Sequence, residues 1–342
     1  MTEPVTLHRD ELLAAARGGD EIAFRELVEP HQRELHAHCY RMTASLDDAD
    51  DMVQEVMLRA WRGLPRFEGR SSFRTWLYRI ATNVCLTALE QRTRRILPVD
   101  RGQPNRPSDT REAPVAESVW IEPYPDEVLG VREGLADPEA RYEQRESVEL
   151  AFVAALQHLP ANQRAALILR EVLGFSAREV AEALDTTVAA VNSALQHARR
   201  TVQTRVPAKS QQATLRELGD ERLRAIVDGY IAALERGDIE AIIDMLSTDA
   251  TWSMPPVPEW YQGAAAIRRL IAGCPDNRAS RYLRTRMNGQ VAVASYGWDA
   301  GAGEYRGKVV EVLTLRGTEI ASITAFVEPG DFDRFGLPAG LP

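Results

Sequence analysis

The sequence predicts a multidomain protein with two all-α domains followed by a C-terminal α+β domain. Apolar residues recur at helical spacing from about residue 10 to 95, and again up to about residue 206. Beyond Asp249 the pattern changes to short strand-like runs, and helices followed by consecutive strands indicate an α+β domain. These changes of pattern predict boundaries that divide the chain into five parts: 1–96, 97–136, 137–206, 207–220 and 221–342.

Composition favours a soluble protein. The chain of 342 residues has a net charge of -9, lacks a run of about 18 apolar residues and does not start with an apolar signal core. We therefore expect a cytoplasmic protein with no membrane association. The three cysteines are isolated in the sequence and form no CxxC, so no disulfide framework or cysteine-based zinc site is expected.

The first part is predicted to be a succession of helices. A helix over about 10–38 is interrupted near Gly18-Gly19, and two more cover about 47–63 and 72–94. His31, His36, His38 and Cys39 carry metal-ligating atoms, but His36 and His38 would point about 200° apart on a helix. We expect no metal and no cofactor.

Residues 97–136 predict an acidic, proline-rich linker, extended or disordered, because they contain many prolines and no sustained periodicity. Helix is expected to resume at Asp137-Pro138-Glu139, where Asp can cap the helix and Pro occupies its first position. A second polar linker is expected at 207–220, before an amphipathic helix at 221–236.

The sequence SAREVAEALDTTVAAVNSALQHARRTV at 176–202 predicts a helix-turn-helix. Ser176 and Glu179 form a capping box, Asp185 stands in the turn, and Thr187 is placed to cap the second helix. The second helix has an apolar stripe that includes Val188, and its opposite face has short or amide side chains near its start, with arginines further along. That arrangement suits base edges and then phosphates. The outward residues are Ala189, Asn192, Ser193, Gln196, Arg199 and Arg200.

Three stretches in register resemble the extracytoplasmic-function (ECF) sigma factors, the promoter-recognition subunits of bacterial RNA polymerase. They are SLDDADDMVQEVMLRAWRGL (45–64), FEGRSSFRTWLYRIATNVCLTALEQRTRR (67–95) and LPANQRAALILREVLGFSAREVAEALDTTVAAVNSALQHARR (159–200). The resemblance implies a region 2 domain at 1–96 and a region 4 domain at 137–206, separated by a linker that is long for the family. It also implies that the protein is not an enzyme and that it directs transcription initiation.

The resemblance further assigns binding surfaces. The −35 promoter element would be read by the second helix of the helix-turn-helix, from Thr187 to Arg200. The −10 element would be held as single-stranded DNA by the segment after Phe67, whose aromatic, hydroxyl and amide groups suit an unpaired base. The expected −10 residues are Arg70, Ser71, Arg74, Arg79 and Asn83. On that helix we expect Thr75, Tyr78 and Thr82 to lie outside the apolar stripe.

The partners implied are promoter DNA and core RNA polymerase, through the clamp helices of its largest subunit and through its flap. The helix over 47–63 carries an acidic-polar ridge that a basic partner would attract. The expected polymerase-binding residues are Asp50, Asp51, Gln54 and Glu55.

Residues 221–342 resemble the SnoaL-like domain, a curved sheet wrapped by helices into a cone. A subset of ECF sigma factors carries such a domain, which implies regulation of the sigma core, with a small-molecule ligand as a further candidate partner. The candidate ligand pocket comprises Trp252, Met254, Trp260, Tyr261 and Trp298. A purely structural or dimerisation module stays open, as does catalysis, which would need a buried carboxylate among Asp249, Asp299, Glu311 and Glu328.

Two alternatives from other classes remain at this point. The chain could be a free-standing, ligand-responsive helix-turn-helix transcriptional regulator whose N-terminal half only forms oligomers. It could also be an enzyme domain fused to a DNA-binding segment. Binding to core polymerase distinguishes the sigma factor from both.

Overall fold

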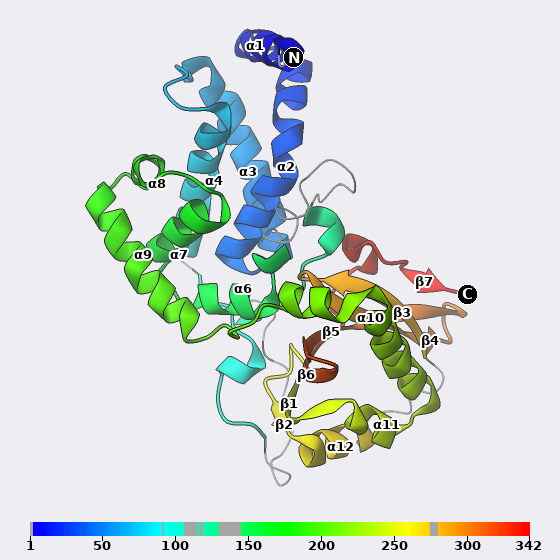
Figure 1. Cartoon of the computed structure of the whole chain (residues 1–342). Helices are drawn as coiled ribbons and strands as arrows, with labels where there is room; N and C mark the ends of the chain where they lie inside the picture. Colours follow the sequence, from blue (N-terminus) through cyan, green and yellow to red (C-terminus); the bar gives the residue numbers. More distant parts are fainter. Residues whose placement is uncertain (1–2, 91, 106–114, 116–118, 130–144, 274–279) are drawn as a thin grey trace. The chain divides into compact units, whose positions relative to one another are not determined.

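A computed structural model describes residues 3–90, 92–105, 115, 119–129, 145–273 and 280–342. The chain divides into two compact units. The first contains Met1–Arg92 and Leu156–Val202, and the second contains Thr93–Ala155 and Gln203–Pro342. The first unit is helical, whereas the second is built around a sheet (Figure 1). No helix within the described ranges is long and apolar enough to cross a membrane.

Four helices form the N-terminal part of the first unit, and each of the last three begins at a side-chain cap. Asp20, Ser45 and Ser72 each accept a hydrogen bond from a backbone N–H in the first helical turn. The predicted break near Gly18-Gly19 is confirmed, because Gly19 adopts a φ of 95° between the first two helices. The helices are α1 (Glu3–Arg17), α2 (Glu21–Thr43), α3 (Leu46–Gly63) and α4 (Phe73–Leu89).

The helix-turn-helix lies in the C-terminal part of this unit. That part begins at Leu156, near the end of α6 (Leu150–Gln157). The capping box of Ser176 and Glu179 is confirmed, and Asp185 adopts the left-handed conformation with a φ of 49°. The elements that follow α6 are α7 (Ala161–Leu167), a π-helical turn η5 (Ile168–Val172), α8 (Ala177–Ala183) and α9 (Val188–Gln203). The helix expected to start at Asp137 lies outside the described residues.

A buried arginine joins the two parts of the first unit. Arg164 on α7 donates to the Met42 carbonyl at the end of α2, and to the Gln157 side chain at 2.6 Å. Gln157 in turn donates to the Arg41 carbonyl at 3.2 Å. A buried guanidinium is tolerated only where acceptors surround it, so α7 and α2 are held in a defined arrangement.

The second unit contains a curved sheet in the order β2-β1-β6-β5-β4-β3. Strand β1 runs parallel to β6, the other neighbours are antiparallel, and β7 pairs with β5. The strand-like runs predicted beyond Asp249 are confirmed as strands. The strands are β1 (Leu246–Ser253), β2 (Trp260–Gln262), β3 (Arg281–Met287), β4 (Gln290–Asp299), β5 (Glu304–Arg316), β6 (Glu319–Val327) and β7 (Gly340–Leu341).

Three helices, α10 (Gln211–Arg236), α11 (Ile239–Asp244) and α12 (Ala264–Ala272), pack against this sheet (Figure 1). Their apolar residues and those of the sheet form one core, which includes Val227, Trp252 and Ile323. Helix α10 begins inside the predicted linker 207–220 and bends at Gly219, whose φ is 71°. The early start is stabilised by Gln211, which exchanges two hydrogen bonds with the backbone of Leu315 on β5.

The described residues of the predicted linker 97–136 pack within the second unit. Trp120, Ile121 and Tyr124 are buried. Asn288, at the turn between β3 and β4, exchanges backbone and side-chain hydrogen bonds with Tyr124 and donates to the Val148 carbonyl at 2.8 Å. The C-terminal domain therefore holds segments on both sides of the undescribed residues 130–144.

Candidate nucleic-acid and polymerase interfaces

Helix α4 presents two of the predicted −10 residues together. Arg79 and Asn83 are exposed and lie one turn apart on the same face of the helix. A guanidinium beside an amide gives this face one group for a phosphate and one for a base edge. The geometry therefore suits a single nucleic-acid strand running across α4.

The loop before α4 carries the next two predicted residues. Arg70 is exposed and forms an ion pair with Glu68, while the Ser71 hydroxyl donates to the Ser72 carbonyl at 3.4 Å. Gly69 has a φ of 73°, which a residue with a side chain rarely adopts. Because both partners of the Arg70–Glu68 pair are exposed, the pair is weak and Arg70 is free to exchange it for a phosphate.

Arg74 lies on a different face of α4 from Asn83. Its guanidinium pairs with Glu34 on α2 at 3.2 Å and stacks over the rings of Tyr78 and Phe175, with centroids at 4.9 and 5.1 Å. Phe175 belongs to the turn before α8, and Glu179 on α8 accepts a hydrogen bond from Thr75 at 3.2 Å. The start of the helix-turn-helix thus covers Arg74, so the structure does not bring Arg74 to the face of Arg79 and Asn83.

Three polar residues of α4 that were expected outside the apolar stripe are in fact buried. Tyr78 donates to Glu34 at 3.2 Å, Thr82 bonds His38 at 3.0 Å, and Thr75 lies under α8. The expectation was wrong because α2 supplies hydrogen-bond partners for Tyr78 and Thr82, and Glu179 on α8 supplies one for Thr75. Burial also raises the pKa of the Tyr78 phenol well above its usual range, so this phenol keeps its proton.

Helix α9 exposes the whole predicted −35 set. The Thr187 hydroxyl caps the helix by accepting from the Ala190 N–H at 3.2 Å. Arg199 pairs with Glu171 at 2.5 Å, and Val188, expected on the inner stripe, is 43% exposed because it stands in the first turn. Val191, Leu195 and Ala198 form the buried side. The exposed residues are Thr187, Ala189, Asn192, Ser193, Gln196, Arg199 and Arg200.

The predicted acidic-polar ridge lies along α3. Asp50 pairs with His36 on α2 at 3.0 Å, and Glu55 pairs with Arg59 at 2.6 Å, one turn further along. Asp51 and Gln54 are exposed between them. Two of the four residues therefore keep their polar groups available to a partner.

An apolar groove of about 660 Å³ lies beside this ridge, between α2 and α3. Val53, Met57 and Trp61 line its α3 side, and Phe24 packs edge-on against Trp61 with ring centroids 5.1 Å apart. Leu58, which also lines it, is 50% exposed. The sequence analysis did not identify this groove, although Phe24, Leu27 and Val28 stand at helical spacing on its α2 side.

The structure does not bring the five candidate pocket residues of the C-terminal domain together. Trp252 is buried in the core, and Met254 and Tyr261 pack against that core. Trp260 instead donates to the Gly102 carbonyl of the linker at 3.1 Å, and Trp298 is 52% exposed. The large hollow described for this domain is lined by none of the five.

Of the four carboxylates considered for catalysis, Glu311 alone is buried. Burial raises the pKa of its carboxyl to about 7, and the Tyr230 hydroxyl donates to it at 3.0 Å. Hydrogen bonds from Arg316 to Asp249, and from backbone N–H groups to Asp299, hold the pKa of each below its usual range. Glu328 is exposed. Glu311 lines neither the groove beside α3 nor the hollow beside β3.

Three separate stretches of the chain match models of known protein families. Residues 27–95 match the family model of Sigma-70 region 2, residues 149–202 match that of Sigma-70 region 4, and residues 227–323 match that of the SnoaL-like domain. The chain is also 44% identical over 332 residues to the ECF RNA polymerase sigma factor SigG of Mycobacterium tuberculosis. That match covers 96% of this chain and 86% of the relative.

The chain belongs to the ECF RNA polymerase sigma factors. The region 2 match of this sigma factor contains α3 and α4, and its region 4 match contains α8 and all of α9 except its last residue. The chain is also 32% identical over 195 residues to the ECF RNA polymerase sigma-E factor of Escherichia coli K12, which is 57% of this chain and 92% of that protein.

The whole fold of this sigma factor has a counterpart among solved structures. The sigma factor SigJ of Mycobacterium tuberculosis aligns over 90% of this chain and 97% of its own, with a TM-score of 0.58 and 21% identity. At that identity the likeness supports the fold alone. Helical sigma domains followed by a SnoaL-like α+β domain are therefore an architecture shared with another ECF sigma factor.

Proposed function

We propose that this sigma factor binds core RNA polymerase, recognises −35 and −10 promoter elements and directs transcription initiation. The observation that carries the proposal is the exposed polar face of α9, backed by a buried stripe that fixes the helix. Asn192, Ser193 and Gln196 would contact base edges in the major groove, while Arg199 and Arg200 would contact phosphates.

Helix α4 and the loop before it would hold the −10 element as a single strand. Arg79 and Asn83 share the exposed face that supports this role, and Arg70 extends it into the loop. Arg74 can join them only when Phe175 and Glu179 move away, because these residues now cover it. Engagement of the −10 element by Arg74 thus requires α8 to separate from α4.

Core polymerase would dock on α3. The acidic ridge supplies electrostatic attraction to a basic surface, and the groove beside it supplies apolar contact area. The exposed Leu58 and the half-buried Met57 would provide the central contact. This combination of a polar rim and an apolar centre is typical of a protein interface.

The SnoaL-like domain would regulate the sigma domains by holding the linker between them. Trp120, Ile121 and Tyr124 are buried in the second unit, and Asn288 binds the backbone of Tyr124. A linker held in this way cannot extend through the polymerase until it is released. The domain would therefore limit the fraction of molecules that are competent to initiate.

Co-elution of the purified chain with core polymerase on a sizing column tests the proposed docking. We expect wild type to co-elute, and Met57→Glu with Leu58→Glu to lose binding because two charges enter the groove. Arg33→Glu, a charge change at an exposed site on α2, should keep it. If the wild-type chain does not co-elute with core polymerase, the proposed function is wrong.

A further inference from the structure

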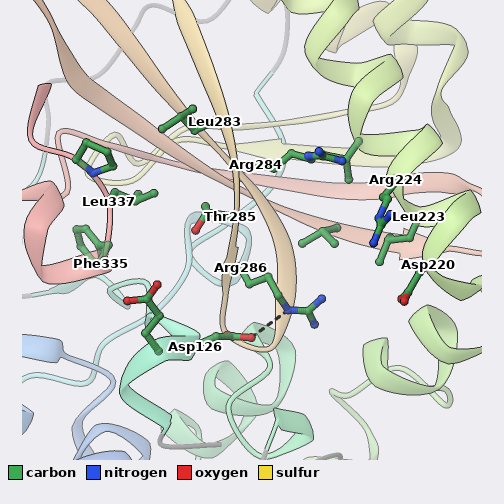
Figure 2. A pocket seen from close by; sticks show the side chains of 15 residues that line it. Asp126, Asp220, Leu223, Arg224, Leu283, Arg284, Thr285, Arg286, Phe335 and Leu337 are labelled. Carbon is green, nitrogen blue, oxygen red and sulfur yellow. Dashed lines mark hydrogen bonds and ion pairs between the residues drawn. The ribbon is translucent and has the colours of Figure 1, made fainter. Parts of the chain in front are cut away.

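A hollow of about 630 Å³ runs along the edge of β3 in the second unit. Four consecutive residues of this strand, Leu283 to Arg286, line it (Figure 2). Successive side chains of a strand point to opposite faces, so a cavity lined by all four must lie along the strand's edge rather than on one face. An occupant of the hollow would meet the backbone groups of that edge.

Strand β3 is the last strand in the sheet order, and β4 is its neighbour on one side. On the other side, the described residues pair with it only at its end, where Pro125 forms an antiparallel bridge with Met287. Within the described ranges, Arg281 to Arg286 therefore have an open edge. An open strand edge presents N–H and C=O groups that can pair with another strand.

The two sides of the hollow differ in chemistry. Arg284 and Arg286 point to the side of α10, toward Arg224, as Figure 2 shows. Leu283 and Thr285 point to the opposite side, toward Phe335 and Leu337. A strand paired with β3 would thus place alternate side chains beside arginines and beside apolar groups.

We propose that this groove binds an extended peptide segment of a partner protein, in which acidic and apolar side chains alternate. The segment would add a strand to the edge of β3, with α10 on one side and residues 335–338 on the other. Its acidic side chains would face Arg224 and Arg284, and its apolar side chains would face Leu283 and Phe335. Main-chain pairing supplies affinity in this mode of recognition, and the alternate side chains supply specificity.

Three arginines and three carboxylates line the groove, and two of these arginines, Arg224 and Arg284, are placed to meet an acidic partner. Arg224 has no hydrogen bond or ion pair among the described residues. Arg284 pairs with Asp228 at 3.1 Å, but both side chains are at least half exposed, so a partner carboxylate can replace Asp228 at small cost. The acids Asp220 and Glu127 also line the hollow, and Asp220 lies one helical turn before Arg224 on α10.

Arg286 closes one end of the groove. It pairs at 3.2 Å with Asp126, whose side chain is only 11% exposed and also accepts from the Gly289 N–H at 2.7 Å. The peptide therefore enters from the Arg281 end and stops where Pro125 already pairs with Met287.

A second copy of this chain is a poor occupant. Antiparallel pairing of two β3 strands about their centre would set Arg284 directly opposite the Arg284 of the second copy. Like charges directly opposite one another destabilise a strand pair. The arginine at the centre of this edge thus disfavours self-association and favours an acidic strand.

A fluorescent peptide of about eight residues with alternating Glu and Val tests the proposal by anisotropy with the full chain. We expect it to bind at least about tenfold more tightly than the same peptide with Lys in place of Glu, because Arg224 and Arg284 face the charged positions. Alternate residues of an extended peptide direct their N–H groups to the same edge. Methylation of the backbone amides that face β3 should therefore abolish binding, whereas methylation of those that face away should not.

Arg284→Ala should weaken this peptide several-fold, and Arg316→Ala is the matched control. Arg316 is also an exposed arginine on the same sheet and pairs with Asp249 at 2.8 Å, but it lies outside the groove. Equal binding of the acidic and basic peptides, or equal effects of the two variants, would overturn the proposal. If octanoate displaces the peptide and both methylated peptides bind like the parent, the groove takes a small anion and strand addition is wrong.

Discussion

Arg79 and Asn83 are the two exposed side chains of α4 that face a DNA strand in the proposed function. Because both are exposed, their replacement should alter binding without altering the stability of the fold. We expect Arg79→Ala to weaken binding of single-stranded −10 DNA by the polymerase holoenzyme about tenfold, the effect of losing a phosphate contact of about 1.4 kcal/mol.

Arg33→Ala is the control for this prediction, since Arg33 is an exposed arginine of the same domain on α2. Equal loss of binding in both variants would mean that general positive charge, rather than the α4 face, attracts the DNA. Fluorescence anisotropy with a short labelled strand measures both.

Glu311 gives the second unit a predictable pH dependence. Burial raises the pKa of its carboxyl to about 7, above the value of about 4.3 in an unfolded chain, so the folded state favours the protonated acid. Its contribution to stability is therefore complete below about pH 4.3 and is lost as the pH rises through 7. Glu149, whose pKa burial also raises to about 7, should act in the same direction.

We expect the thermal midpoint of this unit to fall as the pH is raised from about 6 to 8, and to fall less in Glu311→Gln. Glutamine keeps an acceptor for the Tyr230 hydroxyl while it removes the ionisable group. Glu319→Gln, at an exposed position on β6, should retain the slope of the wild type. Identical slopes in Glu311→Gln and wild type would contradict the assignment.

At the scale of elements, different residues of α9 should contact the bases and the phosphates of the −35 element. Gln196→Ala should cost about 1–3 kcal/mol on the matching promoter and relax preference at one base pair. Arg200→Ala should weaken binding to all sequences alike and reduce the slope of log K against log salt by about one. Anisotropy with matched and substituted −35 duplexes over a salt series distinguishes the two, and the reverse pattern would contradict the assigned roles.

The linker contact is the second element with a measurable consequence. Asn288→Ala removes the acceptor of the buried Tyr124 N–H, and an unsatisfied buried donor costs about 1–3 kcal/mol. We expect faster hydrogen exchange in residues 119–129, while the strands β5 and β6 keep their protection. Asn192→Ala, at an exposed site on α9, should leave exchange in this segment unchanged.

The sequence could predict those elements whose signals are local. The capping box of Ser176 with Glu179 and the strand runs of the sheet each depend on neighbouring residues, and each is confirmed. The burial of Tyr78 could not be predicted, because Glu34 on α2 supplies its hydrogen-bond partner from 44 positions away. The packing of Tyr124 could not be predicted from the sequence either, since its hydrogen-bond partner Asn288 lies 164 positions further along the chain.

At the scale of the whole molecule, the chain combines a sigma core with a domain that holds the linker of that core. The net charge of -9 is compatible with DNA binding, because the predicted DNA-facing positions on α4 and α9 carry arginines while α3 carries the acidic ridge. Release of the linker should therefore raise activity. We expect Asn288→Ala to initiate more transcripts per molecule than wild type, and equal or lower run-off activity from a correctly folded variant would contradict regulation through the linker.

Run-off transcription by core polymerase and the full chain, on a library of promoter sequences, tests the sigma function itself. We expect transcripts that depend on the added chain and that select for defined −35 and −10 elements. We further expect Gln196→Ala to change selection only in the −35 element and Asn83→Ala only in the −10 element. Transcripts that show no sequence selection, or no dependence on the added chain, would contradict the proposed function.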